Sequence, residues 1–184
     1  MGDIMDNTKT LETDRLILRK YRIEDAEGMF NNWATDSNTT KYLSWEPHES
    51  IDVTRNYISK NISQYANGLY NWVVELKDNH EVIGSISEVG RSTRNKTITL
   101  GYCYGSKFWN NGYASETLRR VIEYLLSEQD FYMVEANHRS SNPASGRVMQ
   151  KAGMKYDATL RKRMLETDGD RADKVCYSIT KDEL

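Results

Sequence analysis

A strand-like stretch that passes through a glycine loop into a helix-like stretch is the feature that most restricts the fold of this chain. In residues 96–104, apolar Ile98 and Leu100 alternate with polar residues, which predicts a strand. The segment Trp109–Ala114, with the sequence WNNGYA, is called the glycine loop here. After it, apolar residues recur with a helical period to about residue 128. This order of elements is typical of proteins whose helices pack on a sheet.

The rest of the chain shows the same two kinds of pattern. Further strands are expected at 15–21, 71–77, 82–88, 131–137, 155–165 and 174–180, and further helices at 23–33, 50–65 and 143–152. Antiparallel hairpins followed by a β-α-β-α-β passage indicate an α/β fold of the α+β type, with a mixed, mostly antiparallel sheet of about seven strands flanked by helices. No internal repeat or linker is evident, so residues 1–184 are expected to form a single domain, with residues 1–10 as a flexible arm.

Charge and cysteine content restrict the partners. The 25 lysines and arginines nearly balance 27 aspartates and glutamates, so neither nucleic acid nor an acidic tail is indicated. Cys103 and Cys176 lack metal-ligand spacing and are expected to be reduced core thiols. The N-terminal sequence lacks the apolar core of a signal peptide, although Lys181–Leu184 spells a retention signal, and no run is long enough to span a membrane. A soluble cytoplasmic protein is expected.

The glycine loop allows two interpretations. A glycine between a strand and a helix can bring several backbone N–H groups onto one point, where an anion also meets the positive end of the helix dipole. The loop has no lysine and lacks the three-glycine spacing of a dinucleotide site, so it matches neither a nucleoside-triphosphate loop nor a dinucleotide fingerprint. Spacing alone leaves a plain turn and a phosphate site about equally supported.

A second motif, Asn142-Pro143-Ala144-Ser145, precedes the helix that ends near Gly153. Asparagine before a first-turn proline is an ordinary helix start, so capping alone accounts for Asn142. Capping does not account for Ser145, whose hydroxyl could face solvent, bond to the backbone or donate a proton to a leaving group.

These motifs in this order resemble the GNAT superfamily of acetyl-CoA-dependent N-acetyltransferases, and in particular its RimJ/RimL-like branch of ribosomal-protein N-terminal acetyltransferases. The resemblance runs from the opening Leu11-Glu12-Thr13-Asp14-Arg15-Leu16 to the last strand. It includes Phe108 with the glycine loop, the Asn142–Ser145 motif and Lys151-Ala152-Gly153-Met154. Each motif is weak alone, whereas their order and spacing together are specific.

The resemblance implies a coenzyme A site. Backbone N–H groups of the glycine loop would bind the pyrophosphate, although Trp109 replaces the basic or amide residue of the general pattern and Asn110 replaces a frequent glycine. The strand before the loop would splay from the strand at 131–137 and pair with the pantetheine arm, to which Asn142 would hydrogen-bond. The residues expected to contact acetyl-CoA are Tyr102, Cys103, Tyr104, Asn110, Asn111, Gly112, Tyr113, Ala114, Ser115 and Asn142.

The resemblance also implies catalytic roles. Many relatives protonate the departing thiolate with a tyrosine seven residues after the asparagine, but that position is Met149 here. The RimL-like branch has a serine three residues after it, which makes Ser145 the candidate general acid. Glu88 could act as a general base, directly or through water, or could be an ordinary strand-end carboxylate.

Three other side chains compete with Glu88 more weakly: Glu46 and His48 in an aromatic-rich loop, and His138, which is expected in the loop after the strand at 131–137. The expected reaction is direct attack of a primary amine on the thioester, with acetyl-CoA as cosubstrate and no metal. The expected acceptor is a protein or peptide N-terminal α-amine. The alternatives are a small amine such as a polyamine, amino sugar or antibiotic, or a coenzyme A-binding module without activity. The protein could be a monomer or a homodimer.

Overall fold

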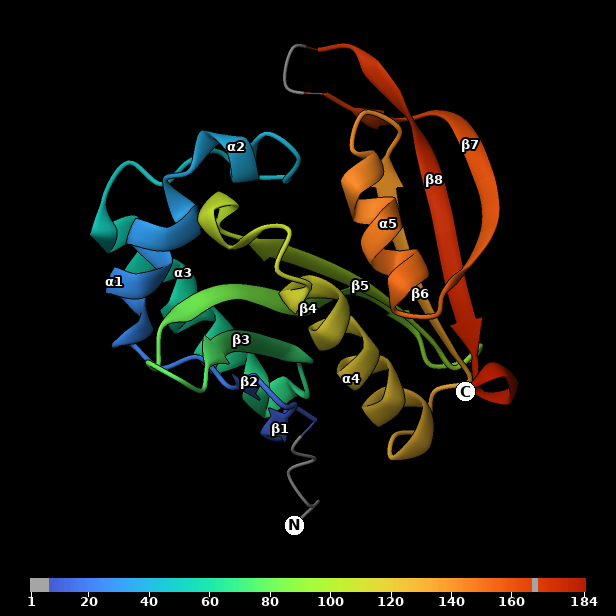
Figure 1. Cartoon of the computed structure of the whole chain (residues 1–184), viewed down its shortest axis with the longest axis horizontal. Coiled ribbons are helices and arrows are strands. Elements are labelled where there is room, and N and C mark those ends of the chain that lie inside the picture. The colour runs from blue at the N-terminus through green and yellow to red at the C-terminus, as the bar shows by residue number, and fades with distance from the viewer. Residues whose placement is uncertain (1–6, 167–168) are drawn as a thin grey trace. The chain divides into compact units, whose positions relative to one another are not determined.

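The computed structural model describes residues 7–166 and 169–184, and these residues form an α/β fold around one eight-stranded sheet (Figure 1). The strands are β1 (Leu11–Glu12), β2 (Leu16–Arg19), β3 (Asn71–Leu76), β4 (Val82–Ser92), β5 (Thr97–Tyr104), β6 (Met133–Arg139), β7 (Lys155–Leu165) and β8 (Arg171–Thr180). Their order across the sheet is β1-β2-β3-β4-β5-β6-β8-β7. The predicted mixed, mostly antiparallel sheet is confirmed, with β5 and β6 as a parallel pair.

Five α-helices accompany the strands in the described part of the chain. They are α1 (Asp25–Met29), α2 (Ser37–Thr40), α3 (Ile51–Gln64), α4 (Tyr113–Ser127) and α5 (Pro143–Lys151). A turn of π-helix, Phe30–Ala34, continues α1, and a short 3-10 turn, Ser106–Phe108, precedes the glycine loop. None of the helices in residues 7–166 and 169–184 is long and apolar enough to cross a membrane.

The chain divides into two compact units. The first comprises the described residues of Met1–Ser87 together with Tyr102–Tyr113, and the second comprises Glu88–Gly101 together with the described residues of Ala114–Leu184. The boundary therefore falls inside three elements. β4 divides after Ser87, β5 after Gly101, and α4 after Tyr113. The expectation of a single domain over residues 1–184 stays a prediction.

The first unit begins with a short hairpin that the sequence did not reveal. β1 pairs antiparallel with β2, with Glu12 opposite Ile17, so Asp14 and Arg15 form a two-residue tip. At the base of this tip the Thr13 N–H donates to the Leu16 carbonyl at 3.0 Å, and the Leu16 N–H donates to the Thr13 hydroxyl at 3.0 Å. This two-residue strand accounts for the eighth strand of the sheet, because only β2 was predicted here.

The sequence predicted a flexible arm over residues 1–10, but the described residues directly before β1 are packed against the first unit. Residues 1–6 of the expected arm lie outside the described residues. Asn7 and Thr8 are buried, at 7% and 2% exposed. The Asn7 amide donates to the Gly68 carbonyl at 2.7 Å, and the Thr8 hydroxyl accepts from the Asn71 N–H at 3.0 Å. These bonds fix the entry into the hairpin against the start of β3.

The core of the first unit is formed by side chains of α1, α3 and β3. Met29 and Trp33, from α1 and the turn after it, pack in one buried cluster with Ile58 of α3 and Val73 of β3. Each of these side chains is at most 1% exposed. Full burial of such a side chain contributes roughly 1.5–3 kcal/mol relative to its exposure. The apolar face predicted for the helix at 50–65 therefore packs into this cluster through Ile58, and this packing holds α3 in the first unit.

The second unit is built on β6, β7 and β8, with α5 packed against β6 and β8 (Figure 1). In this unit β5 and β6 run parallel and pair from Thr97↔Met133 to Leu100↔Ala136. The expected splaying of these two strands beyond the pairs stays a prediction. The periodic apolar residues of α4 are buried as the sequence predicts: Leu118, Val121, Ile122 and Leu125 are each at most 1% exposed.

The last residues are part of the folded second unit. Lys181–Glu183 forms a 3-10 turn capped by Thr180. The Glu183 carboxylate pairs with Lys155 at 2.6 Å and accepts from the Thr180 N–H at 2.9 Å. The hydrogen bond from Lys155 is the main cause that lowers the pKa of Glu183 to about 2. The tail that resembles a retention signal thus takes part in ion pairing with β7.

Candidate functional site

The glycine loop is a tight turn shaped by two left-handed residues. Asn110 and Gly112 have φ angles of +63° and +81°. Glycine adopts this region without steric cost, and asparagine is among the residues that tolerate it best. The asparagine at position 110 therefore keeps the turn that a glycine would allow. The loop enters α4 at Tyr113.

Side chains within the loop stabilise its shape. The indole N–H of Trp109 donates to the Tyr104 carbonyl at 2.8 Å, although the ring is 42% exposed. The Asn111 amide donates to the carbonyls of Phe108 and Trp109 at 3.2 and 3.1 Å. The side chains of Trp109 and Asn111 thus stabilise the conformation of the loop. Any anion would meet the backbone of the loop.

The backbone of the loop suits an anion. Residues 110–112 are exposed, and they lead into a 15-residue helix. The first N–H groups of a helix have no acceptor within the helix, and together they carry a partial positive charge. A phosphate placed there would accept from these groups. The geometry therefore supports the phosphate interpretation that spacing alone left open.

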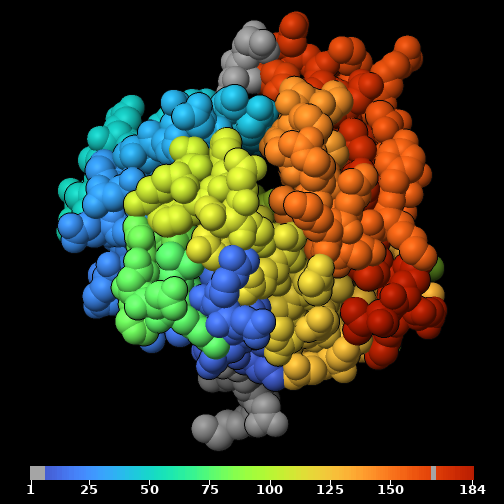
Figure 2. Space-filling model, viewed as in Figure 1, coloured from blue at the N-terminus to red at the C-terminus, as the bar shows by residue number. Residues whose placement is uncertain are grey.

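Arg15, which the sequence did not single out, contacts this loop. Its guanidinium donates from Nη1 to the Asn111 carbonyl at 3.1 Å, and its Cζ lies 4.5 Å from the centroid of the Tyr113 ring. The surface view shows the N-terminal segment (blue) beside the segment that follows β5 (yellow) (Figure 2). The two segments are far apart in sequence, so no local pattern predicts the contact.

The end of β5 leads to the loop through three predicted coenzyme residues. Tyr102 and Cys103 are half-buried, and Tyr104 is buried. The Tyr104 carbonyl is already occupied, since it accepts from Trp109 and from the Thr39 hydroxyl at 3.0 Å. Any pairing of β5 with the pantetheine arm would therefore use backbone groups before this carbonyl.

Cys103 is a free thiol next to Ser85, with 3.4 Å between Sγ and Oγ. Burial raises the pKa of its thiol, so the thiol stays protonated at neutral pH. A protonated thiol is a poor nucleophile.

The Asn142 motif starts α5 in the second unit, as capping predicts. The Ser145 N–H donates to the side-chain oxygen of Asn142 at 3.4 Å and to its carbonyl at 3.2 Å. Ser145 is half-buried, and Met149 one turn later is 1% exposed and belongs to the core. The side chain that replaces the tyrosine of many relatives is thus a packing residue, and Ser145 is the hydroxyl of this motif.

Glu88 lies in β4 with one carboxylate oxygen paired and one unpaired. Its Oε1 is 3.2 Å from the Arg91 Nε. Its Oε2 is buried and has no hydrogen-bond partner among the described residues. A buried carboxylate oxygen without a partner is uncommon and is available to accept a proton or to bind water. β4 runs on to Ser92, so Glu88 does not lie at the end of the strand, where it was expected. Its role as a general base stays a prediction.

The competing bases lie in different surroundings. Glu46 is exposed. The His48 ring is 5.0 Å from that of Trp45 and 5.9 Å from that of Tyr57, and its Nδ1 is 2.8 Å from the Thr54 hydroxyl. Burial lowers the pKa of His48, which keeps its imidazole neutral near pH 7. His48 therefore serves the aromatic cluster of the first unit.

His138 is not in a loop, as was expected, but in β6, because the strand runs two residues further than its apolar pattern. It is 9% exposed, its Nδ1 lies 2.7 Å from the Arg139 carbonyl, and its ring stacks on Tyr177. A Cβ at Gly146 would come within 2.6 Å of the His138 Nε2. The glycine of α5 therefore allows close packing on this histidine, which has a structural role.

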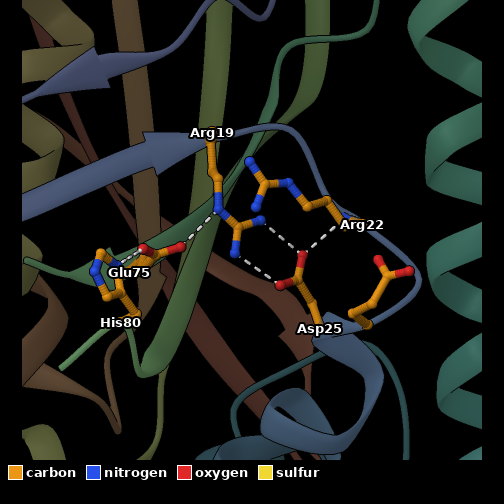
Figure 3. A pocket seen from close by; sticks show the side chains of 6 residues that line it. Arg19, Arg22, Asp25, Glu75 and His80 are labelled. Carbon is orange, nitrogen blue, oxygen red and sulfur yellow. Dashed lines mark hydrogen bonds and ion pairs between the residues drawn. The ribbon is translucent and has the colours of Figure 1, made fainter.

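A polar pocket of about 440 Å³ in the first unit was also not predicted (Figure 3). Buried Arg19 at the end of β2 pairs with Asp25 of α1 at 2.8 Å and with Glu75 of β3 at 2.7 Å. Exposed His80 bonds to the other Glu75 oxygen at 2.6 Å. Burial opposes ionisation of Glu75, but the hydrogen bonds from His80 and Arg19 outweigh it and lower the pKa of this carboxyl. The network joins two strands and a helix, so its first role is structural.

The placement of the cysteines and acidic side chains in the described part of the chain bears on the expectation that no metal is used. Cys103 and Cys176 are both free. Within residues 7–166 and 169–184, no three histidine, cysteine, aspartate or glutamate side chains are grouped so that they could hold a metal ion.

Comparison with known proteins identifies the family. The sequence profile described as "Acetyltransferase (GNAT) domain" matches residues 15–155. The uncharacterized N-acetyltransferase YoaA of Bacillus subtilis is 33% identical over 173 residues, which cover 93% of this chain and 96% of that protein. The [ribosomal protein uS5]-alanine N-acetyltransferase of Escherichia coli is 27% identical over 183 residues, covering 92% and 90%.

The fold agrees with this result. The crystal structure of the GNAT-family acetyltransferase from Bacillus anthracis superposes with a TM-score of 0.83 at 26% identity, covering 95% of this chain and 99% of that one. The chain therefore belongs to the GNAT family of acetyltransferases, and it resembles the RimJ/RimL-like branch of that family.

Proposed function

We propose that this acetyltransferase transfers the acetyl group of acetyl-CoA to a primary amine, and that the acceptor is the N-terminal α-amine of a protein or peptide. The observation that carries the proposal is the glycine loop, in which left-handed Asn110 and Gly112 lead an exposed backbone into α4 of a GNAT chain. The similarity to a relative named for a ribosomal-protein alanine supports the class of acceptor.

The chain's own groups would hold the cosubstrate. The backbone from Asn110 to Ser115 would bind the pyrophosphate, because its N–H groups and the helix dipole favour an anion. Backbone groups at Tyr102–Tyr104 would pair with the pantetheine arm, and Asn142 would hydrogen-bond to it. The bound thioester supplies an activated acetyl group, and no metal is used in this scheme.

The pKa of the acceptor sets the help that the protein must give. An α-amine with a pKa of about 7.7–8.0 is partly neutral at cytoplasmic pH, whereas a lysine side chain near about 10.4 is almost fully protonated. An N-terminal amine therefore needs only a weak base. Glu88 fits this need, because its buried Oε2 has no hydrogen-bond partner among the described residues.

Ser145 would assist the departing thiolate. Its N–H is engaged in capping α5, so its hydroxyl can act without disturbing the helix start. An alkoxide is a less stable anion than a coenzyme A thiolate, so complete proton donation from serine is unfavourable. We therefore assign the hydroxyl a hydrogen bond to the leaving sulfur, or relay of a proton from water.

The proposal is tested by acetyl-dependent thiol release. The purified chain is incubated with acetyl-CoA and, separately, with a peptide library of free N-termini, the same library with blocked N-termini, and a set of small amines. We expect thiol release with the free N-termini only, and mass spectrometry should place one acetyl group on the α-amine.

The other outcomes identify the alternatives. Turnover with polyamines, amino sugars or aminoglycosides alone would replace the peptide acceptor by a small amine. Turnover with blocked peptides that contain lysine would indicate side-chain acetylation. Binding of acetyl-CoA without thiol release under any condition would leave a coenzyme A-binding module.

A further inference from the structure

We propose that Glu166, the residue after β7, positions Asn142 for the pantetheine arm of the coenzyme by holding the turn that leads into α5. This inference rests on the proposed function, in which Asn142 hydrogen-bonds to that arm. Both residues belong to the second unit. Glu166 is a positioning residue in this scheme, because it acts through Asn142 and touches no reacting atom.

Residues 139–142 form the turn between β6 and α5. The Asn142 N–H donates to the Arg139 carbonyl at 2.8 Å, which closes a four-residue turn. The same carbonyl lies 2.7 Å from the Nδ1 of His138 in β6. The turn therefore connects the end of the strand directly to the residue that caps α5, and its conformation sets the direction of the Asn142 side chain.

The Glu166 carboxylate contacts two side chains of this turn, one with each oxygen. Its Oε1 accepts from the Ser141 hydroxyl at 2.5 Å, and its Oε2 lies 3.4 Å from the Arg139 Nε. The side chains of Arg139 and Glu166 are only 12% and 18% exposed. Solvent therefore screens this ion pair less than it screens a pair on the surface.

Backbone contacts hold the β7–β8 hairpin against the same turn. The Arg139 Nη2 donates to the Leu165 carbonyl of β7 at 3.1 Å. The Ser140 N–H donates to the Asp173 carbonyl of β8 at 2.9 Å, and the Asp173 N–H donates to the Ser140 hydroxyl at 3.2 Å. None of these bonds uses the Glu166 side chain. Replacement of Glu166 should therefore loosen the turn without detaching the hairpin.

The cap of α5 alone holds Asn142 weakly. Its side-chain oxygen accepts from the Ser145 N–H at 3.4 Å, which is long for a hydrogen bond. The side-chain NH2 group of Asn142 is then the part that can donate to a carbonyl of the pantetheine arm. A donor that is oriented before the ligand arrives needs less ordering on binding. The turn, and with it Glu166, supplies the orientation that the cap does not.

The test asks whether Glu166 acts through Asn142. Glu166→Ala removes both contacts to the turn, and Asn142→Ser removes the amide but keeps a residue that caps helices well. The two single variants and the double variant are compared by kcat/KM for acetyl-CoA and for S-acetylpantetheine. Calorimetry gives Kd for coenzyme A and for adenosine 3′,5′-bisphosphate, which has no pantetheine arm. Asp157→Ala is the matched control, because this β7 carboxylate accepts from Ser178 of β8 at 2.9 Å and not from the turn.

We expect Glu166→Ala and Asn142→Ser each to weaken coenzyme A binding about 10-fold, because a displaced contact group loses much of its effect. The kcat/KM should fall similarly for both acetyl donors, mainly through KM, while the Kd for adenosine 3′,5′-bisphosphate stays within about twofold. The double variant should resemble Asn142→Ser, since a positioning residue has no further effect once the group that it positions is removed. Glu166→Gln keeps an oxygen for Ser141 and should recover part of the affinity. Asp157→Ala should bind as wild type.

Three results would overturn the inference while wild-type activity leaves the proposed function intact. The first is wild-type coenzyme affinity in Glu166→Ala. The second is a double variant whose loss is the product of the two single losses, because Glu166 would then act independently of Asn142. The third is an equal loss for coenzyme A and adenosine 3′,5′-bisphosphate, or for Glu166→Ala and Asp157→Ala, because Glu166 would then only maintain the fold. Wild-type protein that binds no coenzyme A would instead overturn the proposed function and this inference together.

Discussion

Ser145 carries two polar groups with separable roles. Its N–H caps α5 through Asn142, and its hydroxyl is assigned to the leaving group. Substitution by alanine removes the hydroxyl and keeps the cap, so structure and chemistry can be distinguished at this residue.

Ser145→Ala is expected to lower kcat by roughly 10- to 100-fold, at or below the lower end of general-acid effects, because serine is a weak acid. The Kd for acetyl-CoA should change less than about twofold. Steady-state thiol release and calorimetry measure the two quantities. The control is Ser59→Ala, the same change on the exposed face of α3, which should leave both unchanged. Full turnover by Ser145→Ala would reduce Ser145 to a helix residue.

The glycine loop shows how the conformation of one element sets its chemistry. A Cβ at Gly112 would have room, since its nearest neighbour is the Arg15 guanidinium at 3.5 Å. The cost of a side chain comes from the backbone, because φ is +81°. For aspartate, a second cost comes from the negative charge that it places at the proposed phosphate site.

Gly112→Asp is therefore expected to weaken coenzyme A binding more than 10-fold, through repulsion of phosphate and through an ion pair with Arg15. The backbone strain should lower the free energy of unfolding by about 1–2 kcal/mol. Gly169→Asp in the β7–β8 turn is the matched control, because Gly169 is also left-handed, at φ +90°, with nothing within 4 Å of an added Cβ. Equal coenzyme affinity in wild type and Gly112→Asp would contradict the assignment of the loop.

Sequence patterns predicted the elements whose signal is periodic. α3, α4 and α5 begin and end within about two residues of the predicted bounds, because each buries one apolar face. The two-residue β1 and the four-residue α2 were missed, since neither is long enough to show a period. β8 begins at Arg171 rather than 174, because its pairing with β7 continues through Ala172 and Arg171, before the alternating stretch that the sequence shows.

The parts of the site that the sequence did not reveal depend on contacts between distant segments. Arg19 and Glu75 are separated by 56 positions, and Arg15 and Asn111 by 96. Such ion pairs and capping contacts leave no periodicity and no spacing rule. The glycine loop and Ser145 were found because family resemblance preserves their order along the chain. The buried Oε2 of Glu88, which has no hydrogen-bond partner among the described residues, could be identified only from the folded structure.

The stability of the whole molecule should depend on pH through the Arg19 network. Glu75 has a pKa below its ordinary 4.5 in the folded state. Its contribution to stability is therefore fully present above about that pH and is lost as pH falls through the folded pKa. Both buried partners of Arg19 lie in the first unit, Asp25 in α1 and Glu75 in β3.

Glu75→Gln is expected to lower the free energy of unfolding at pH 7 by about 3 kcal/mol, because it removes one partner of a buried pair. Below pH 4.5 the difference from wild type should shrink, since wild-type Glu75 then becomes protonated. Urea unfolding from pH 3 to 8 measures both curves. Glu27→Gln, at an exposed carboxylate of α1, is the control and should run parallel to wild type. A constant difference between Glu75→Gln and wild type at all pH values would contradict this coupling.

The contact between Arg15 and Asn111 also bears on the order in which the protein becomes competent. The arginine precedes its partner by 96 residues along the chain. A contact of such long range forms only after the intervening segments have closed a large loop, which is slow compared with helix formation. During synthesis, the hairpin at Arg15 can therefore meet its partner only after the 96 residues up to Asn111 have followed it. The proposed phosphate site would form after the hairpin that contacts it.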